Sequence, residues 1–407
     1  MSELFKPLTL NNNMIIKNRF FKAAMSENMA TKDHNPTDRL VSLYKKWAQG
    51  GTGLLITGNV MVDRMALGEL GNVVVDEKTD KTKLRQWAEA GKVNSTHIWM
   101  QLNHPGKQSP SVLTKKPVAP SAIPLSGSMA NYFNTPRELT NDEILEIIKK
   151  FGTSARIAKE TGFTGIQIHG AHGYLVSQFL SPLHNQRQDE WGGSITNRIK
   201  FLTDIYLEIR KNVGPNFPIS LKLNSADFQR GGFTEEESMT VLSTMSNLGV
   251  DLIEISGGSY EKPAFLDNQS DSSKAREGYF LKYAQKAKEI VKVPLVVTGG
   301  FRSIDGMLEA IKSGNTDMVG LAKPLALCVD LPNQIKNKTY KTIETPKIKT
   351  GIKKVDDSVV MLEIGWYEIQ LDRISRGLEP DPNYSPWLAI FKFILKNGKL
   401  TFQKRRM

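Results

Sequence analysis

Two histidines and a tyrosine stand within six residues of each other, directly after a short apolar run. His169, His172 and Tyr174 belong to the segment Ile166 to Pro182, which reads IQIHGAHGYLVSQFLSP. Imidazole and phenol groups donate hydrogen bonds, transfer protons or ligate metals, although a lone histidine beside an apolar run is most often structural. Interleaved glycines favour a turn that lets a ligand approach the backbone. We expect catalysis at this cluster, with a metal site and a structural turn as alternatives.

Two further polar residues interrupt apolar runs. Lys222 lies in ISLKLNSADF and Gln101 in IWMQLNHPG. A lysine inside a strand is costly to bury unless it pairs with a charge or a ligand, so a buried ion pair with a carboxylate is the structural alternative to a binding role. Gln101 can both donate and accept hydrogen bonds, as a planar heteroaromatic ring requires, and its alternative is a plain core amide.

A phosphate site is expected from two later segments. VVTGGF places Gly299 and Gly300 after an apolar run, where their N–H groups can face an anion, and VGLAKPL places Lys323 after the next run. In (β/α)8 barrels, phosphate sites are often built from the loops after strands seven and eight.

The elements that must position these residues alternate between short apolar runs and amphipathic stretches from Asn18 to about Gln334. Such alternation predicts parallel strands with covering helices, and eight units predict an α/β fold, the (β/α)8 TIM barrel. Capping boxes at Thr140 with Glu143 and at Thr234 with Glu237 mark two helix starts. The expected strands are Phe20 to Ala24, Leu54 to Thr57, Ile98 to Leu102, Gly165 to Ile168, Ile219 to Leu223, Leu252 to Ile255, Leu295 to Val297 and Met318 to Leu321.

Two segments fall outside this alternation. The stretch from Asn103 to Leu139 is rich in Pro, Ser and Lys and too long for an ordinary connection, so we expect a lid over the site. We therefore divide the chain into a barrel over residues 1–335 and a C-terminal extension over residues 336–407. The aromatics of the extension predict that it packs on the barrel or on a neighbouring subunit of a homo-oligomer; they are Trp366, Tyr367, Trp387, Phe391, Phe393 and Phe402.

Composition narrows the function classes. The single cysteine, Cys328, excludes a disulfide framework, a four-cysteine zinc site and an iron–sulfur cluster. No stretch resembles a signal peptide or a bilayer span, so a cytoplasmic location without membrane partners is expected. The net charge is +12, and residues 336–407 carry fifteen basic against eight acidic residues. We interpret this excess as a solvated face and expect no nucleic-acid partner.

The segments HGAHGYLVSQFLSP and HNQRQDEWGGSITNR closely resemble the old yellow enzyme family of FMN-dependent NAD(P)H oxidoreductases. The resemblance extends over about Leu4 to Leu331 and includes NRFFKAAMS, QLNHPGKQ, KLNSADF, TGGF and AKPL. It implies a barrel that binds FMN at the C-terminal mouth, with NADH or NADPH as reductant. It also implies an activated alkene as oxidant, an enone, enal, maleimide or nitroalkene that receives hydride from flavin N5 at its β-carbon.

The resemblance also assigns roles to individual residues. His169 and His172 match the pair that hydrogen-bonds the substrate's carbonyl or nitro oxygen, and Tyr174 matches the proton donor to the α-carbon. Gln101 matches the residue at the pyrimidine edge of the flavin, and Lys222 matches a cation near N1. The remaining cofactor residues that match are Ala23, Ala24, Met25 and Ser26 around the ring, Asn59 beside it, and Gly299, Gly300, Ala322 and Lys323 at the phosphate; the resemblance implies no metal.

The chain departs from the family pattern at several of these positions. Ala23 and Ala24 stand where many relatives have Ser or Thr followed by Pro, and Ser26 and Asn28 stand where one branch has a redox-tuning Cys and a substrate-contacting Tyr. Lysine at 222 and 323 replaces the usual arginine, which exchanges a bidentate fork for a point charge. The flavin potential and the substrate are therefore left open.

Two alternatives remain. An FMN barrel that reduces uridines in tRNA would explain the basic extension, but such enzymes use a catalytic cysteine near the barrel mouth, and Cys328 follows strand eight. A non-catalytic flavoprotein would retain the barrel without turnover, and the intact histidine and tyrosine cluster argues against it.

Overall fold

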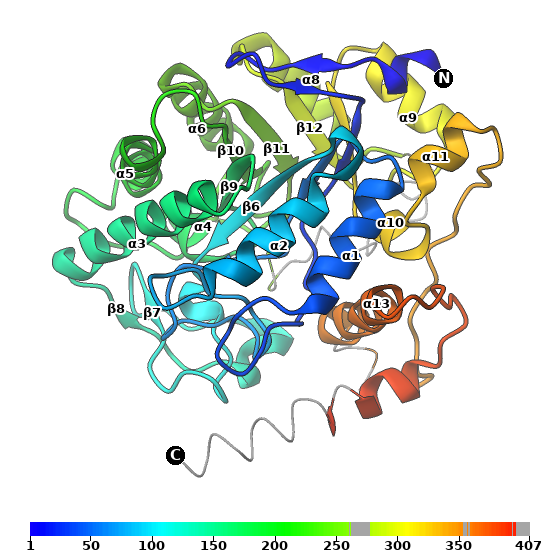
Figure 1. The fold of residues 1–407 in the computed structure, drawn as a ribbon. Helices are drawn as coiled ribbons and strands as arrows, with labels where there is room; N and C mark the ends of the chain where they lie inside the picture. Colours follow the sequence, from blue (N-terminus) through cyan, green and yellow to red (C-terminus); the bar gives the residue numbers. More distant parts are fainter. Residues whose placement is uncertain (260, 262–276, 353–355, 357–358, 393, 396–407) are drawn as a thin grey trace.

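Eight parallel strands form a closed barrel in the computed structural model, which describes residues 1–259, 261, 277–352, 356, 359–392 and 394–395 (Figure 1). β4 pairs with both β3 and β6, so the sheet has no open edge. The predicted (β/α)8 fold is confirmed, and the strand bounds differ by at most two residues from those expected. The strands are β3 (Phe20–Lys22), β4 (Leu54–Ile56), β6 (His97–Asn103), β9 (Gly165–Gly170), β10 (Ile219–Asn224), β11 (Leu252–Ser256), β12 (Leu295–Thr298) and β13 (Met318–Leu321).

The strand register brings chemistry-bearing residues together at one end of the barrel. Lys222 on β10 is the direct neighbour of His169 on β9 and of Glu254 on β11. Because all strands run in the same direction, their carboxyl ends meet at this end, where barrel enzymes place their active sites.

Helices surround the barrel, and most of them follow a strand along the chain. The two capping boxes are confirmed, since the side chains of Thr140 and Thr234 accept from the backbone of Glu143 and Glu237. The helices are α1 (Asp38–Gln49), α2 (Lys81–Gly91), α3 (Asn141–Glu160), α4 (Leu175–Leu180), α5 (Ile195–Val213), α6 (Glu235–Leu248), α8 (Leu281–Ile290), α9 (Ile304–Lys312), α10 (Lys323–Leu327) and α11 (Leu331–Lys336).

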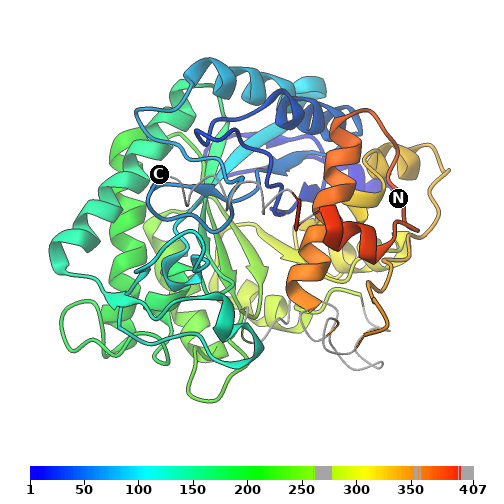
Figure 2. The ribbon, with the colours of Figure 1, turned by 90° about the horizontal axis from the view of Figure 1, so that it is seen from below.

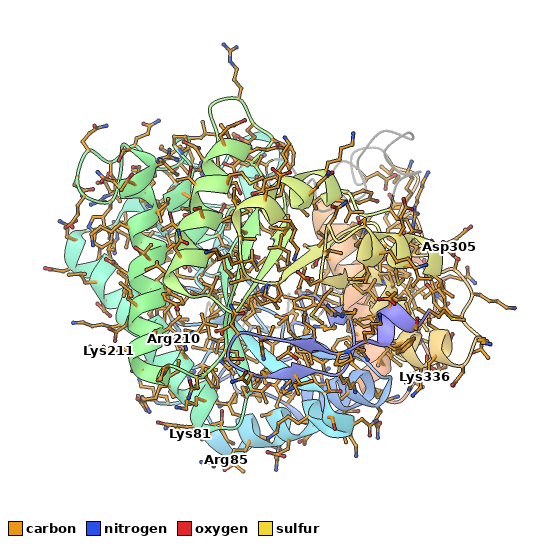
Figure 3. The ribbon with its side chains drawn as sticks, turned by 90° about the horizontal axis from the view of Figure 1, so that it is seen from above. Lys81, Arg85, Arg210, Lys211, Asp305 and Lys336 are labelled. Carbon is orange, nitrogen blue, oxygen red and sulfur yellow. The ribbon has the colours of Figure 1, made fainter. Side chains whose placement is uncertain are left out.

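The amino-terminal end of the barrel is closed by a hairpin of β1 (Leu8–Thr9) and β2 (Ile15–Ile16), which lies across the barrel in Figure 3. Leu8 and Ile16 pack against the inward side chains of the strands, among them Trp99. The charged side chains labelled Lys81 and Lys211 lie at the edge of the molecule in the same view. The hairpin makes this end of the barrel a packed core.

The stretch after β6, for which we predicted a lid, has secondary structure of its own. It contains the 3-10 helices η3 (Gly106–Gln108) and η4 (Gly127–Tyr132) and a small sheet of β7 (Val118–Ala119) and β8 (Arg137–Glu138). The guanidinium of Arg187 holds it by donating to the carbonyls of Pro120 and Leu139. Among the described residues, none between 103 and 139 lines the cavity, and the lid stays a prediction.

The C-terminal extension contains α13 (Val359–Ser375), which packs on α1 and α10 of its own barrel (Figures 1 and 2). Arg39 on α1 and Asp372 on α13 form an ion pair of 2.6 Å. Trp366 is fully buried and donates to the carbonyl of Tyr384 at 2.8 Å. Trp387 and Phe391 are about half exposed, whereas Phe393 and Phe402 lie outside the described residues.

Among the described residues, the structure also has the short elements η1 (Ser2–Phe5), η2 (Val93–Ser95) and β5 (Val60–Met61). Within the ranges given above, no helix is both long and apolar enough to cross a bilayer.

Candidate active site

One cavity of about 230 Å³ opens at the carboxyl ends of the strands. All fourteen residues singled out in the sequence line it, although they come from every part of the barrel. They are Ala23, Ala24, Met25, Ser26, Asn59, Gln101, His169, His172, Tyr174, Lys222, Gly299, Gly300, Ala322 and Lys323. These residues are therefore far apart in the sequence but line the same cavity.

The His169, His172 and Tyr174 cluster is built by a sharp turn out of β9. His172 takes a left-handed conformation with φ of 60°, which is uncommon for a residue other than glycine. Two hydrogen bonds hold it there: its N–H donates to Asn224 Oδ1 at 3.2 Å, and its carbonyl accepts from Gln108 Nε2 at 3.0 Å. The ring of His169 then lies 5.2 Å from that of His172 and 4.8 Å from that of Tyr174, centroid to centroid.

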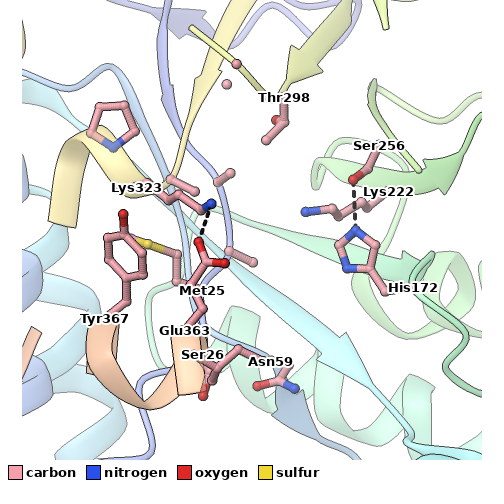
Figure 4. Close-up of a pocket in the computed structure, with 18 of the residues that line it drawn as sticks. Met25, Ser26, Asn59, His172, Lys222, Ser256, Thr298, Lys323, Glu363 and Tyr367 are labelled. Carbon is pink, nitrogen blue, oxygen red and sulfur yellow. Dashed lines mark hydrogen bonds and ion pairs between the residues drawn. The ribbon is translucent and has the colours of Figure 1, made fainter. Parts of the chain in front are cut away.

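Both imidazoles are neutral near pH 7. Burial lowers the pKa of His169 and His172 well below the ordinary value, and the positive charge of Lys222 lowers both further. The N–H of Ala171 donates to His169 Nδ1 at 3.3 Å, which assigns the ring hydrogen of His169 to Nε2. His172 Nε2 lies 2.8 Å from Ser256 Oγ, the contact drawn as a dashed line in Figure 4.

Tyr174 is nearly buried, and its hydroxyl lies beside an amide. Asn59 Nδ2 donates to the phenol oxygen at 3.5 Å, and Asn59 Oδ1 in turn accepts from Asn72 Nδ2 at 3.3 Å. Since the amide is the donor, this contact does not use the phenol hydrogen. The contact fixes the position of the hydroxyl oxygen.

Lys222 and Gln101 line the cavity and also make the buried contacts expected of the structural alternatives. Lys222 Nζ lies 3.0 Å from Glu254 Oε1, so the ion pair considered from the sequence is present. Gln101 Nε2 donates to Gln167 Oε1 at 2.7 Å. The two interpretations are therefore compatible: each side chain is fixed by a neighbour and still faces the cavity.

The far end of the cavity carries the predicted phosphate residues. Gly299 and Gly300 have φ of 128° and 87°, and a Cβ added to Gly300 would lie 2.9 Å from the ring of Tyr279, so a side chain there would clash. Lys323 begins α10 beside them. Its ammonium forms an ion pair with Glu363 of α13, which Figure 4 shows as a dashed line.

α13 forms one wall of the cavity, whereas from the sequence we predicted only that the extension packs on the barrel or on a neighbouring subunit. Glu363, Ile364 and Tyr367 line the cavity, and Glu368 accepts from Ser26 Oγ at 2.7 Å and from Asn28 Nδ2 at 3.0 Å. Other lining residues that we did not single out end predicted strands or follow them, so their positions could have indicated them. They are Ser256, Thr298, Phe301, Arg302, Gly320 and Pro324. Glu69, Tyr279, Phe280 and Thr345 also line the cavity but lie outside this pattern.

Two alternatives from the sequence find no support at this site. Across the part of the chain that the structure describes, no three His, Cys, Asp or Glu side chains are grouped to hold a metal ion. Cys328 does not line the cavity, and burial raises the pKa of its thiol to about 12, with the charge of Asp330 beside it adding to the shift. A thiolate nucleophile is therefore not available near neutral pH.

The chain is similar in sequence to known flavin oxidoreductases. The model of the NADH:flavin oxidoreductase / NADH oxidase family matches residues 3–342. An NADH-dependent flavin oxidoreductase, iliE of Hypocrea jecorina, is 37% identical over 84% of this chain and 92% of its own length. The cinnamate reductase of Clostridium sporogenes is 33% identical over 83% of this chain and 53% of its own length, and the chain likewise spans only 51% of iliE from Neonectria sp..

Solved structures agree with this. A 2-naphthoyl-CoA reductase in complex with 2-naphthoyl-CoA superposes with a TM-score of 0.78 and 27% identity, over 83% of this chain and 52% of that one. The old yellow enzyme homologue from Zymomonas mobilis shares the fold, with a TM-score of 0.73 and 24% identity over 84% and 95% of the two chains. The chain therefore belongs to the NADH:flavin oxidoreductase / NADH oxidase family, that of old yellow enzyme, whose members use FMN with NADH or NADPH as the reductant.

Proposed function

We propose that this flavin oxidoreductase reduces activated alkenes, with Tyr174 as the proton donor. The observation that supports it is the convergence of Tyr174 with two neutral histidines on one cavity wall. Two similar proteins are named as reductases of conjugated compounds, cinnamate and 2-naphthoyl-CoA.

The hydrogen-bond donors of the cavity are placed where FMN would need them. Polar side chains that can bond a heteroaromatic ring, Gln101 and Lys222, lie on one side, with small apolar residues such as Ala23 nearby. The Gly299–Gly300 turn and Lys323 lie together at the other end, where a phosphate would be held by backbone N–H groups and a cation. When bound there, FMN would accept a hydride from NADH or NADPH and pass it to the alkene.

His169 and His172 would hold the substrate oxygen. Because the His169 ring is neutral with its hydrogen on Nε2, it can donate a hydrogen bond without carrying a charge. Negative charge builds on a carbonyl or nitro oxygen as hydride reaches the β-carbon, and donors fixed in place stabilise that charge without reorganising. The hydrogen bonds that lock the His172 backbone keep the second ring in position.

Tyr174 would then protonate the α-carbon. A phenol has a pKa near 10, yet it can still donate to a carbon that carries enolate-like charge, because that carbon is basic. The burial of Tyr174 and its contact with Asn59 fix where the hydroxyl lies.

The direct test is alkene reduction by the purified chain loaded with FMN. The flavin is reduced anaerobically with NADH or NADPH, and cyclohexenone, N-ethylmaleimide or nitrostyrene is then added. The proposal predicts reoxidation of the flavin together with formation of the saturated product. Reduced flavin that no alkene reoxidises would instead support a non-catalytic flavoprotein or a different oxidant.

A further inference from the structure

Glu254 is the hub of a hydrogen-bond network below the cavity. It lies in the middle of an apolar strand, fully buried, and directly opposite Lys222 in the parallel register of β10 and β11. Three donors surround its carboxylate: Lys222 Nζ at 3.0 Å, Gln167 Nε2 at 3.0 Å and Thr298 Oγ1 at 2.7 Å. These three donors hold the buried carboxylate in one place.

This network changes the electrostatic effect of Lys222. The Lys222 side chain is 3% exposed and points into the cavity, as Figure 4 shows, so its charge is poorly screened by water. A lone ammonium there would strongly favour an added negative charge on a neighbouring ring. With the Glu254 carboxylate 3.0 Å away, the pair is close to neutral as a unit, and its effect on that ring is much weaker.

We propose that Glu254 is a positioning residue that lowers the reduction potential of the bound FMN by neutralising Lys222. The proposal rests on the placement of Lys222 beside the flavin ring in the proposed function. Oxidised FMN that takes up two electrons and one proton, as a hydride, becomes an anionic ring. The neutral pair stabilises this anion less than a free lysine would, so the reduced flavin is a stronger hydride donor to the alkene.

Four forms of the holoenzyme test this by charge alone: the wild type, Glu254→Gln, Lys222→Met and the double variant. Removing the carboxylate leaves a net charge of +1 at the pair, removing the ammonium leaves −1, and the double variant is neutral again. We expect Glu254→Gln to raise the equilibrium constant for two-electron reduction of FMN about tenfold, which is a rise of about 30 mV in midpoint potential. Lys222→Met should lower the potential, and the double variant should return it toward the wild-type value.

The potentials are measured by anaerobic dye equilibration at pH 6.5, with melting curves to follow stability separately. Glu237→Gln is the matched control, because Glu237 also pairs with a buried cation, Arg198, but this cation, unlike Lys222, does not line the cavity. It should leave the potential unchanged. If the role of Glu254 were purely structural, the variants would change the melting temperature, but the midpoint potentials would not follow the net charge of the pair.

The outcomes separate this inference from the proposed function. If Lys222→Met lowers the potential and Glu254→Gln does not raise it, Glu254 has no tuning role although Lys222 lies beside the flavin. If neither variant shifts the potential, Lys222 itself is misplaced and the proposed site is wrong. Removing one partner leaves an unpaired buried charge, so Glu254→Gln can fail to fold. The double variant must then show a higher potential than Lys222→Met, and equal potentials overturn the inference.

Discussion

Lys323, in the turn after β13, forms an ion pair with Glu363 of the C-terminal helix α13. The cation expected at the FMN phosphate is therefore joined to a carboxylate from a segment outside the barrel. The side chains of Lys323 and Glu363 are 20% and 13% exposed, so water screens the pair only in part.

Glu363→Gln should strengthen FMN binding about three- to tenfold, because the phosphate would no longer compete with a carboxylate for Lys323. Quenching of flavin fluorescence during titration of the apoprotein gives the dissociation constant. Asp372→Asn is the control, since Asp372 lies on the same helix but pairs with Arg39. Weaker FMN binding by Glu363→Gln would show that Glu363 orients Lys323 and does not compete with the phosphate.

Lys323→Met should weaken FMN binding by roughly ten- to a hundredfold, since a hydrogen bond to a charged group contributes about 1.5–3 kcal/mol. The same titration measures it. An unchanged dissociation constant would remove Lys323 from the phosphate site and, with it, the reason to expect any effect from Glu363.

The histidine pair should cause no change in the rate of alkene reduction between pH 8 and pH 5.5. Burial lowers the pKa of His169 and His172 well below the ordinary value of about 6.5, so both rings stay neutral throughout this range. Single-turnover reoxidation of the reduced enzyme by an enone measures the rate. A rise in rate as the pH falls through 6.5 would show that an imidazolium is the active form.

Folding stability should fall with acid because of a third buried histidine. Burial lowers the pKa of His104 to about 4, whereas in the unfolded chain it is about 6.5. Between these values the unfolded chain binds a proton that the folded chain does not. The contribution of His104 to the free energy of unfolding is therefore complete above pH 6.5, and up to roughly 3 kcal/mol of it is lost as the pH falls to 4. Urea unfolding at pH 7 and pH 5 should show a smaller loss for His104→Gln than for the wild type, and equal losses would contradict the assignment.

The barrel was predictable because its signals are local. Each strand is a short apolar run, and the two Thr and Glu capping boxes mark helix starts within four residues. The first strand was predicted to continue through Ala24, but it ends at Lys22, and Ala23 and Ala24 run on as cavity lining.

The residues that were missed depend on contacts between distant segments. Glu254 was visible as a charged residue in an apolar run, and pairing the strands in order would have placed it opposite Lys222. Glu363 had no such signal, because nothing in the sequence of α13 tells which side of the barrel it covers. The lid was predicted from the length and composition of the stretch after β6, and neither could show that Arg187 holds this stretch by donating to the carbonyls of Pro120 and Leu139.

The assignment of Tyr174 as proton donor is tested most directly by anaerobic stopped-flow on the FMN-loaded Tyr174→Phe variant, with each half-reaction followed separately. The account predicts that flavin reduction by NADH or NADPH is nearly unchanged, while reoxidation by an enone slows by roughly 10²- to 10⁴-fold. Reoxidation at the wild-type rate, or equal slowing of both half-reactions, would contradict it.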